Sequence, residues 1–117
     1  MREFSSGATR DDTTGKPDYE GYLSPLALDR YGKYMLAHQV QADGKLRLSD
    51  NWMKGMGQDV YMKSAWRHFV TWWKLHRGYP CKDERDGHEI TVDEAICGVL
   101  FNAFGYMHET LKQKETQ

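Results

Sequence analysis

The chain is poor in cysteine, in proline and in any excess of one charge. Its 117 residues include two cysteines and three prolines, with 16 basic against 17 acidic side chains. Cys81 and Cys97 are too few for a disulfide scaffold, and their spacing fits no zinc motif. Nucleic-acid binders are usually basic, so the balanced charge argues against a nucleic-acid partner.

Long apolar runs are also missing. No stretch approaches the roughly 18 apolar residues that a membrane-spanning helix needs, and residues 1–4 lack the apolar core of a signal peptide. We therefore expect no membrane partner and a protein of a reducing compartment. A chain of this length is expected to form one domain with a modest core.

Aromatic residues, in contrast, are abundant. The chain holds four Trp and seven Tyr, and 13% of its residues are aromatic. This is a heavy load for a small domain, and it indicates subunit interfaces or a stacking site.

The hydrophobic pattern predicts an all-α fold of three helices, two of them long, near residues 24–38, 59–76 and 92–112. Ser24 and Pro25 are typical of a helix start, and Thr91 with Glu94 forms a capping box. No segment alternates with a period of two. Residues 1–23 are expected to be an ordered irregular arm, and residues 24–117 the helical domain.

The two long helices are each expected to bury an apolar face against the other. These faces comprise Trp66, Phe69 and Trp73 on one helix, and Ile96, Leu100, Phe104 and Met107 on the other. Three helices cannot bury so much apolar surface, so we expect a dimer or tetramer in which the long helices build a four-helix bundle.

The opposite arc of the last helix is unusual. It carries Glu94, Gly98, Asn102 and Gly105, and glycine costs roughly 1 kcal/mol against alanine inside a helix. Close approach of a ligand or of another helix would compensate for this cost.

The N-terminal arm is a candidate anion site. Arg10 and Lys16 lie in a Gly-containing run that Tyr19 and Tyr22 can anchor on a folded body. Backbone amides and cations of such a loop can converge on phosphate. The alternative is a surface arm that packs across a neighbouring subunit.

Other candidate residues have structural alternatives too. His68 borders the aromatic face of its helix and is either a general acid or a hydrogen-bonded boundary residue. Trp52, in a loop, either stacks on a base or plugs the core. Glu94 is either a ligand of a cation or only part of the capping box.

Six short motifs occur in a fixed order along residues 4–112. They are Gly7-Ala8-Thr9-Arg10-Asp11, Gly15-Lys16-Pro17-Asp18-Tyr19, Leu23-Ser24-Pro25, Asn51-Trp52-x-Lys54-Gly55, Arg67-His68 and Phe101-Asn102-Ala103. The ordered set resembles the phage-encoded dATP/dGTP diphosphohydrolase-like family, which is grouped with MazG-like all-α nucleotide pyrophosphohydrolases. Family members often show two histidines where this chain has Ala95 and Gly98.

The resemblance implies a purine nucleotide ligand and the cytoplasm of a bacterial host. If the protein hydrolyses its ligand, we expect Glu94 and His68 as catalytic residues, and Glu94 with Asn102 as ligands of Mg²⁺. The nucleotide-binding residues that we expect are Arg10, Lys16, Asp18, Trp52, Lys54, Arg67 and Asn102.

Three functions stay open on the sequence. The first is Mg²⁺-dependent hydrolysis of a purine nucleoside triphosphate to the monophosphate and pyrophosphate, which the resemblance favours. The second is a protein that binds a nucleotide without cleaving it, as a phage protein that sequesters a host immune signal would do. The small number of carboxylates favours this second function, because an active two-metal site normally needs more of them. The third is an interaction module whose aromatic residues serve only oligomerisation.

Overall fold

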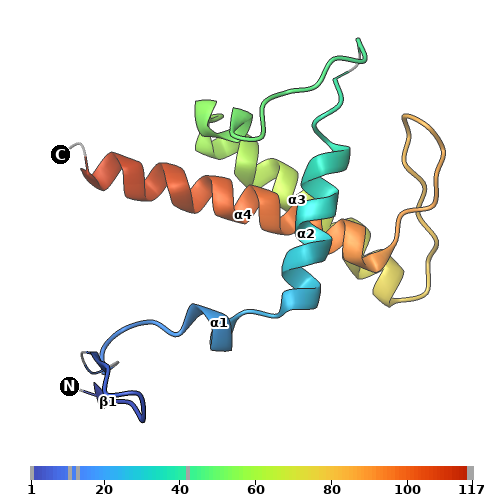
Figure 1. Cartoon of the computed structure of the whole chain (residues 1–117). Coiled ribbons are helices and arrows are strands. Elements are labelled where there is room, and N and C mark those ends of the chain that lie inside the picture. Colours follow the sequence, from blue (N-terminus) through green and yellow to red (C-terminus); the bar gives the residue numbers. More distant parts are fainter. Residues whose placement is uncertain (1, 11, 13, 42, 116–117) are drawn as a thin grey trace.

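The computed structural model describes residues 2–10, 12, 14–41 and 43–115, and this part of the chain is mostly helical. Three long helices, α2 (Pro25–Ala37), α3 (Gln58–His76) and α4 (Val92–Glu115), form the body (Figure 1). A 3₁₀ helix, η1 (Asn51–Lys54), lies between α2 and α3. The predicted all-α class is confirmed, although α4 extends a few residues beyond the predicted end.

Two of the helices begin where the sequence predicts. The Ser24 hydroxyl accepts a hydrogen bond from the backbone N–H of Ala27 at 3.2 Å, and Pro25 is the first residue of α2. The Thr91 hydroxyl accepts from the N–H of Glu94 at 3.3 Å at the start of α4. Both side chains satisfy amide donors that the first helical turn leaves unpaired.

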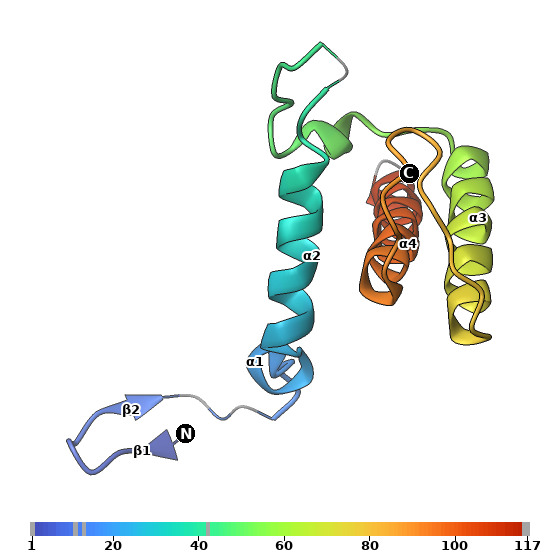
Figure 2. The same cartoon turned by 90° about the vertical axis from the view of Figure 1, so that its right-hand side faces the viewer.

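The N-terminal arm has more regular structure than predicted. Two-residue strands β1 (Arg2–Glu3) and β2 (Thr9–Arg10) pair in antiparallel fashion, and a short helix, α1 (Tyr19–Tyr22), follows them. The Asp18 carboxylate caps α1 by accepting from the N–H of Gly21 at 3.0 Å. The two views show the arm projecting away from the three long helices (Figures 1 and 2).

Helices α3 and α4 lie side by side and pack through small residues. A Cβ added at Gly98 would lie 2.4 Å from His68 Nδ1, and one added at Gly105 would lie 2.3 Å from the Tyr61 ring. Each pair of residues is spaced by two helical turns, so the two contacts repeat in register along antiparallel helices. We call this contact the α3–α4 seam. The two glycines of the polar arc therefore serve the close approach of another helix.

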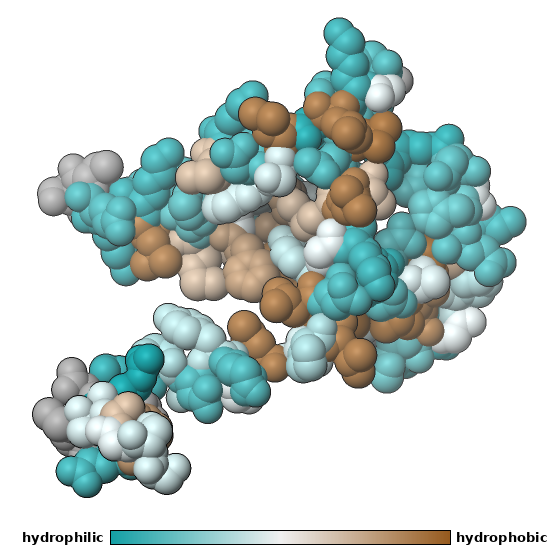
Figure 3. All heavy atoms as spheres, viewed as in Figure 1, coloured by the Kyte–Doolittle hydropathy of each residue, from teal (hydrophilic) through white to brown (hydrophobic). Residues whose placement is uncertain are grey.

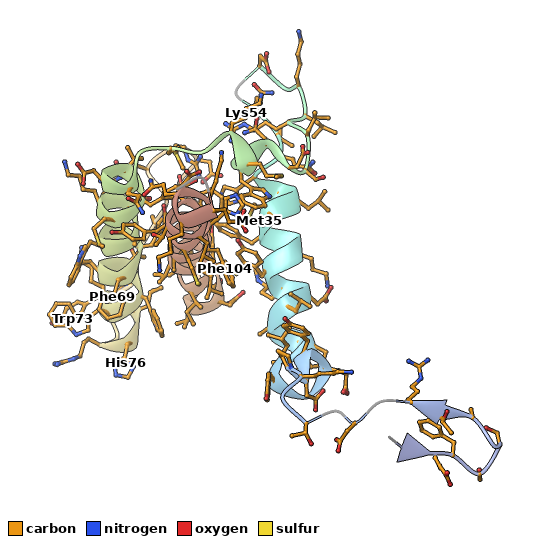
Figure 4. All side chains as sticks on the ribbon, turned by 90° about the vertical axis from the view of Figure 1, so that its left-hand side faces the viewer. Met35, Lys54, Phe69, Trp73, His76 and Phe104 are labelled. Carbon is orange, nitrogen blue, oxygen red and sulfur yellow. The ribbon has the colours of Figure 1, made fainter. Side chains whose placement is uncertain are left out.

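The predicted packing of the two long apolar faces was wrong. Trp66, Trp73 and Phe104 are 62%, 53% and 53% exposed, whereas Tyr61 at the seam is 1% exposed. Trp73 lies on the side of α3 that faces away from α4, and Phe104 lies between α4 and α2 (Figure 4). The apolar faces stay outside because the glycines bring the helices together along the opposite side of α4.

The chain is extended, since the arm projects from the three long helices (Figure 2), and it exposes much apolar surface. Its radius of gyration is 19.0 Å, against about 13 Å expected for a compact domain of this length. Its accessible surface is 9778 Å², against roughly 6,600 Å² for a compact monomer of this mass. Apolar residues gather at the surface on and beside α2 and α4 (Figure 3). Within the described residues, no helix has the length and hydropathy needed to cross a membrane.

Candidate functional site

A cavity of about 420 Å³ lies where the C-terminal half of α2, the following loop with η1, and helices α3 and α4 meet. We call it the central cavity. Its size falls in the range of small-molecule sites, which are commonly 300–1,000 Å³. The wall residues that matter for chemistry are His38, Arg47, Trp52, Arg67, His68 and Asn102.

The permanently charged side chains that the structure describes in the cavity wall are all positive. Arg47 comes from the loop after α2 and Arg67 from the middle of α3, so two guanidinium groups contribute from separate segments. Among the described residues that line the cavity, none is Asp or Glu. Two permanent cations without a carboxylate favour an anionic ligand, and guanidinium groups suit phosphate oxygens in particular.

The loop that carries Arg47 is held by backbone pairing. The N–H of Arg47 donates to the Gln39 carbonyl at 2.7 Å, and the Gln39 side-chain amide donates back to the Arg47 carbonyl at 2.9 Å. An isolated antiparallel bridge between Val40 and Leu46 continues this pairing. The chain therefore doubles back after α2 and returns Arg47 to the cavity.

Trp52 provides the aromatic part of the wall. It is half-buried in η1, and its ring meets that of His108 on α4 edge to face, with centroids 4.8 Å apart. This contact fixes the indole at the boundary of the cavity. An indole face held in this way can stack on a nucleobase.

His68 is pressed against α4 at Gly98. Burial lowers its pKa from the ordinary value, and the nearby Arg67 and His38 lower it further, while Glu94 opposes the change. The imidazole is therefore predominantly neutral at pH 7, which is the form that accepts a hydrogen bond or a proton.

His38, at the end of α2, has a defined tautomer when it is neutral. Its Nδ1 lies 2.8 Å from the Tyr34 carbonyl oxygen, which can only accept, so Nδ1 carries the hydrogen. The lone pair is then on Nε2. The Tyr34 ring lies against the imidazole, with centroids 4.1 Å apart, and burial raises the pKa of Tyr34 to about 12, so its hydroxyl stays protonated.

Asn102 is a polar residue inside the body, only 2% exposed. Its side-chain amide donates to the Gly98 carbonyl at 2.7 Å. This bond uses one of two N–H groups and fixes the orientation of the amide. The amide oxygen and the second N–H form the donor–acceptor pair that matches the N6 and N7 edge of adenine.

Glu94 is engaged next to the cavity rather than in its wall. The His88 ring lies between two carboxylates, with Nε2 2.7 Å from Glu94 Oε1 and Nδ1 2.5 Å from Asp86 Oδ1. These contacts, with Glu94 the stronger, raise the pKa of His88. The capping box is thus half formed: Thr91 caps the helix, and the carboxylate of Glu94 holds the α3–α4 loop.

The residues present do not fit a Mg²⁺ ion. Glu94 and Asn102 are eight residues apart on α4, about 12 Å along its axis, so one ion cannot contact both. Asp83, Asp86 and His88 place their ligand atoms within 4.8 Å of one another. However, both ring nitrogens of His88 already face carboxylates, and Asp83 pairs with Arg85 at 3.2 Å, which lowers the pKa of Asp83 to about 2.

The structure brings together four of the residues predicted from sequence and separates the others. Trp52, Arg67, His68 and Asn102 share the wall of the central cavity. Lys54 is exposed at the end of η1 (Figure 4). The three arm residues are exposed and outside the cavity wall, as the projecting arm in Figure 2 shows; they are Arg10, Lys16 and Asp18.

Two cavity residues were not predicted from sequence, His38 and Arg47. His38 ends a helix, and Arg47 lies in a polar loop without a motif. The sequence indicates these two residues only by their positions. His38 precedes the turn that the chain makes between α2 and η1, and Arg47 follows it. Comparisons of the chain with protein-family models, with curated proteins and with solved structures gave no match, so the assignment rests on the residues of the cavity.

Proposed function

We propose that the protein binds a purine nucleotide in the central cavity and acts as a homo-oligomer. The observation that carries this proposal is the combination of two guanidinium groups and an indole in a wall without carboxylates. Arg47 and Arg67 would hold the phosphates, Trp52 would stack on the base, and Asn102 would bond its polar edge.

Binding without cleavage is the function that the residues support best. Magnesium-dependent hydrolysis requires carboxylates around the ion, and the described cavity wall offers none. A nucleotide held in this way is withheld from other proteins. Together with the family resemblance, this suggests a phage protein that sequesters a purine nucleotide, including an immune signal, in the cytoplasm of a bacterial host.

The exposed surface supports the proposed oligomer, a dimer or a tetramer. The chain exposes roughly 3,000 Å² more than a compact monomer of its mass would. Obligate dimers commonly bury 2,000–5,000 Å² in total. A second copy is the simplest source of an equal and complementary apolar surface.

Titration calorimetry with dATP in EDTA tests the site. Arg67→Ala should weaken binding by about 1–3 kcal/mol, or roughly 5- to 150-fold, because a charge-assisted hydrogen bond to phosphate is lost. Lys54→Ala is the matched control, since Lys54 lies outside the cavity wall, and it should bind as the wild type does. Unchanged affinity in Arg67→Ala, with a loss in Lys54→Ala, would place the site elsewhere.

A second measurement separates binding from hydrolysis. The protein is incubated with dATP and Mg²⁺, and the products are separated by ion-exchange chromatography. We expect no pyrophosphate release by the wild type. Release that disappears in Glu94→Gln would show instead that Glu94 supports turnover.

A further inference from the structure

A second hollow of about 580 Å³ adjoins the central cavity between α2 and α4. We call it the α2–α4 groove. Its walls are Tyr31 and Met35 from α2 and Phe101, Phe104, Met107 and Leu111 from α4, with Trp52 and His108 at one end. Met35 and Phe104 lie in the space between the two helices (Figure 4).

The groove is wide because α2 contacts α4 at few points. The Arg30 guanidinium pairs with the Asp93 carboxylate near the start of α4, and the rings of Tyr31 and Phe104 meet with centroids 5.8 Å apart. No residue with a permanent charge is among the described residues that line the groove. The mainly apolar lining favours an apolar occupant, because an unpaired charge would lose its hydration there.

Helix α4 itself offers such an occupant. Phe104, Met107 and Leu111 recur at helical spacing and are each at least half exposed, so they form an apolar ridge along one wall of the groove. Each copy thus offers both a groove and a ridge within one patch. A two-fold axis requires this self-complementary arrangement, whereas the arm carries several charges and matches the groove poorly.

The groove and the central cavity share part of their walls. Met35, Ser49, Trp52 and Phe101 line both hollows. A helix seated in the groove would cover the side of the cavity on which Trp52 and Phe101 lie. It would exclude water from the indole, and this favours stacking on a base.

We propose that the α2–α4 groove receives the α4 ridge of a second copy, and that this contact closes the nucleotide cavity. The coupling of assembly to ligand rests on the proposed nucleotide site, whereas the contact itself does not. Because binding free energies are reciprocal, dATP strengthens the dimer by the same factor by which the dimer strengthens dATP binding.

Sedimentation equilibrium across micromolar concentrations tests the contact. The wild type should be dimeric or larger, and Met107→Glu should weaken self-association at least 10-fold while keeping its helical circular dichroism, because Met107 is half exposed in the single chain. Trp73→Glu, on the outer side of α3, is the matched control and should keep the interface across the groove.

Several results would overturn the proposed contact. These are a monomeric wild type, self-association unchanged in Met107→Glu, or dissociation caused by Trp73→Glu alone. A chain that lacks residues 1–23 should still associate through the groove. If its removal dissociates the protein as fully as Met107→Glu does, the arm rather than the α4 ridge fills the groove.

The coupling is tested by dATP titration in EDTA of the wild type and Met107→Glu. We expect affinity at least 10-fold weaker in Met107→Glu, and a dimerisation constant for the wild type that tightens with dATP. Equal affinities in the two proteins would overturn the coupling and leave the nucleotide site intact. A dimeric wild type that binds no dATP would refute the nucleotide site and the coupling, but not the contact.

Discussion

The α3–α4 seam and the α2–α4 groove use the same helix α4 in opposite ways. At the seam, Gly98 and Gly105 bring two helices so close that no Cβ fits between them. At the groove, large apolar side chains such as Phe104 and Met107 stand half exposed between helices that scarcely touch. One face of α4 is thus closely packed within the chain, and the other is largely exposed.

This difference separates the contact that stabilises the fold from the surface at which we propose that a second copy binds. The seam gains contact from close approach and lets polar residues such as His68 and Asn102 lie inside the body. The groove leaves a larger apolar area exposed, where the proposed second copy would bind. The predictions below separate the two regions, beginning with the largest expected effect.

The seam is most sensitive at Gly105. Gly105→Ala places a Cβ 2.3 Å from the ring of Tyr61, which is 1% exposed and has no room to move. We expect a loss of about 1–3 kcal/mol in the free energy of unfolding, as for other overpacked cores. Urea unfolding at fixed protein concentration measures it.

The control for Gly105 is Gly32, inside α2. A Cβ there would meet nothing within 4 Å, so Gly32→Ala should stabilise the chain by about 0.4–1 kcal/mol through helix propensity and a less flexible unfolded state. If both substitutions stabilise the protein equally, α3 and α4 do not approach as closely as described.

Trp52 lines both the groove and the central cavity. Its removal should weaken ligand binding more than it lowers the stability of the fold. Trp52→Ala should weaken dATP binding by about 1–3 kcal/mol, since stacking on a base is lost, while Trp52→Phe should retain part of the affinity. Calorimetry with dATP measures both. Trp66→Ala, on the exposed face of α3, is the control. Equal losses in Trp66→Ala and Trp52→Ala would argue against stacking at Trp52.

Local signals in the sequence predicted the helix starts but not the packing faces. Ser24 and Thr91 act within one helical turn, so their roles depend on little else in the fold. The packing of Trp66 against Phe104 was wrong because an apolar stripe indicates burial but not whether the partner is in the same chain. The packing face is indicated instead by two equal spacings of seven residues, between Gly98 and Gly105 and between Tyr61 and His68.

Part of the candidate site was also predictable from local sequence motifs. Trp52, Arg67, His68 and Asn102 belong to short motifs, and the fold brings them to one cavity. His38 and Arg47 reach it only because the chain reverses after α2, which no local pattern specifies. Arg10, Lys16 and Asp18 match their motifs as well as the others do, yet the described chain places them in the projecting arm.

His68 and His88 should have pKa values shifted in opposite directions from the ordinary value. Burial lowers the pKa of His68, so its contribution to stability is lost as the pH falls below the ordinary value of 6.5. Glu94 and Asp86 raise the pKa of His88, so its contribution is present below 6.5 and is lost as the pH rises through its higher pKa.

Proton–carbon NMR of the imidazoles measures both titrations, with His68→Gln and His88→Gln for assignment. We expect the His68 midpoint below 6.5 and the His88 midpoint above it. The reverse order would mean that His68 is not pressed against Gly98 and that His88 does not lie between the carboxylates.

The smallest effect is expected at the ion pair between α2 and α4. Arg30 and Asp93 are both substantially exposed, so Arg30→Gln should cost less than about 1 kcal/mol in thermal or urea unfolding. A loss as large as that of Gly105→Ala would show that this pair is a main contact between α2 and α4.

Photolabelling with 8-azido-dATP tests the central claim most directly, because it reports where the base lies. The protein is irradiated in EDTA with and without excess dATP, digested with trypsin, and mapped by mass spectrometry. We predict competitor-sensitive label in the peptide of residues 48–54, which contains Trp52. Label confined to the arm peptide of residues 11–30, with the peptide of residues 48–54 unmodified, would contradict a nucleotide site in the central cavity.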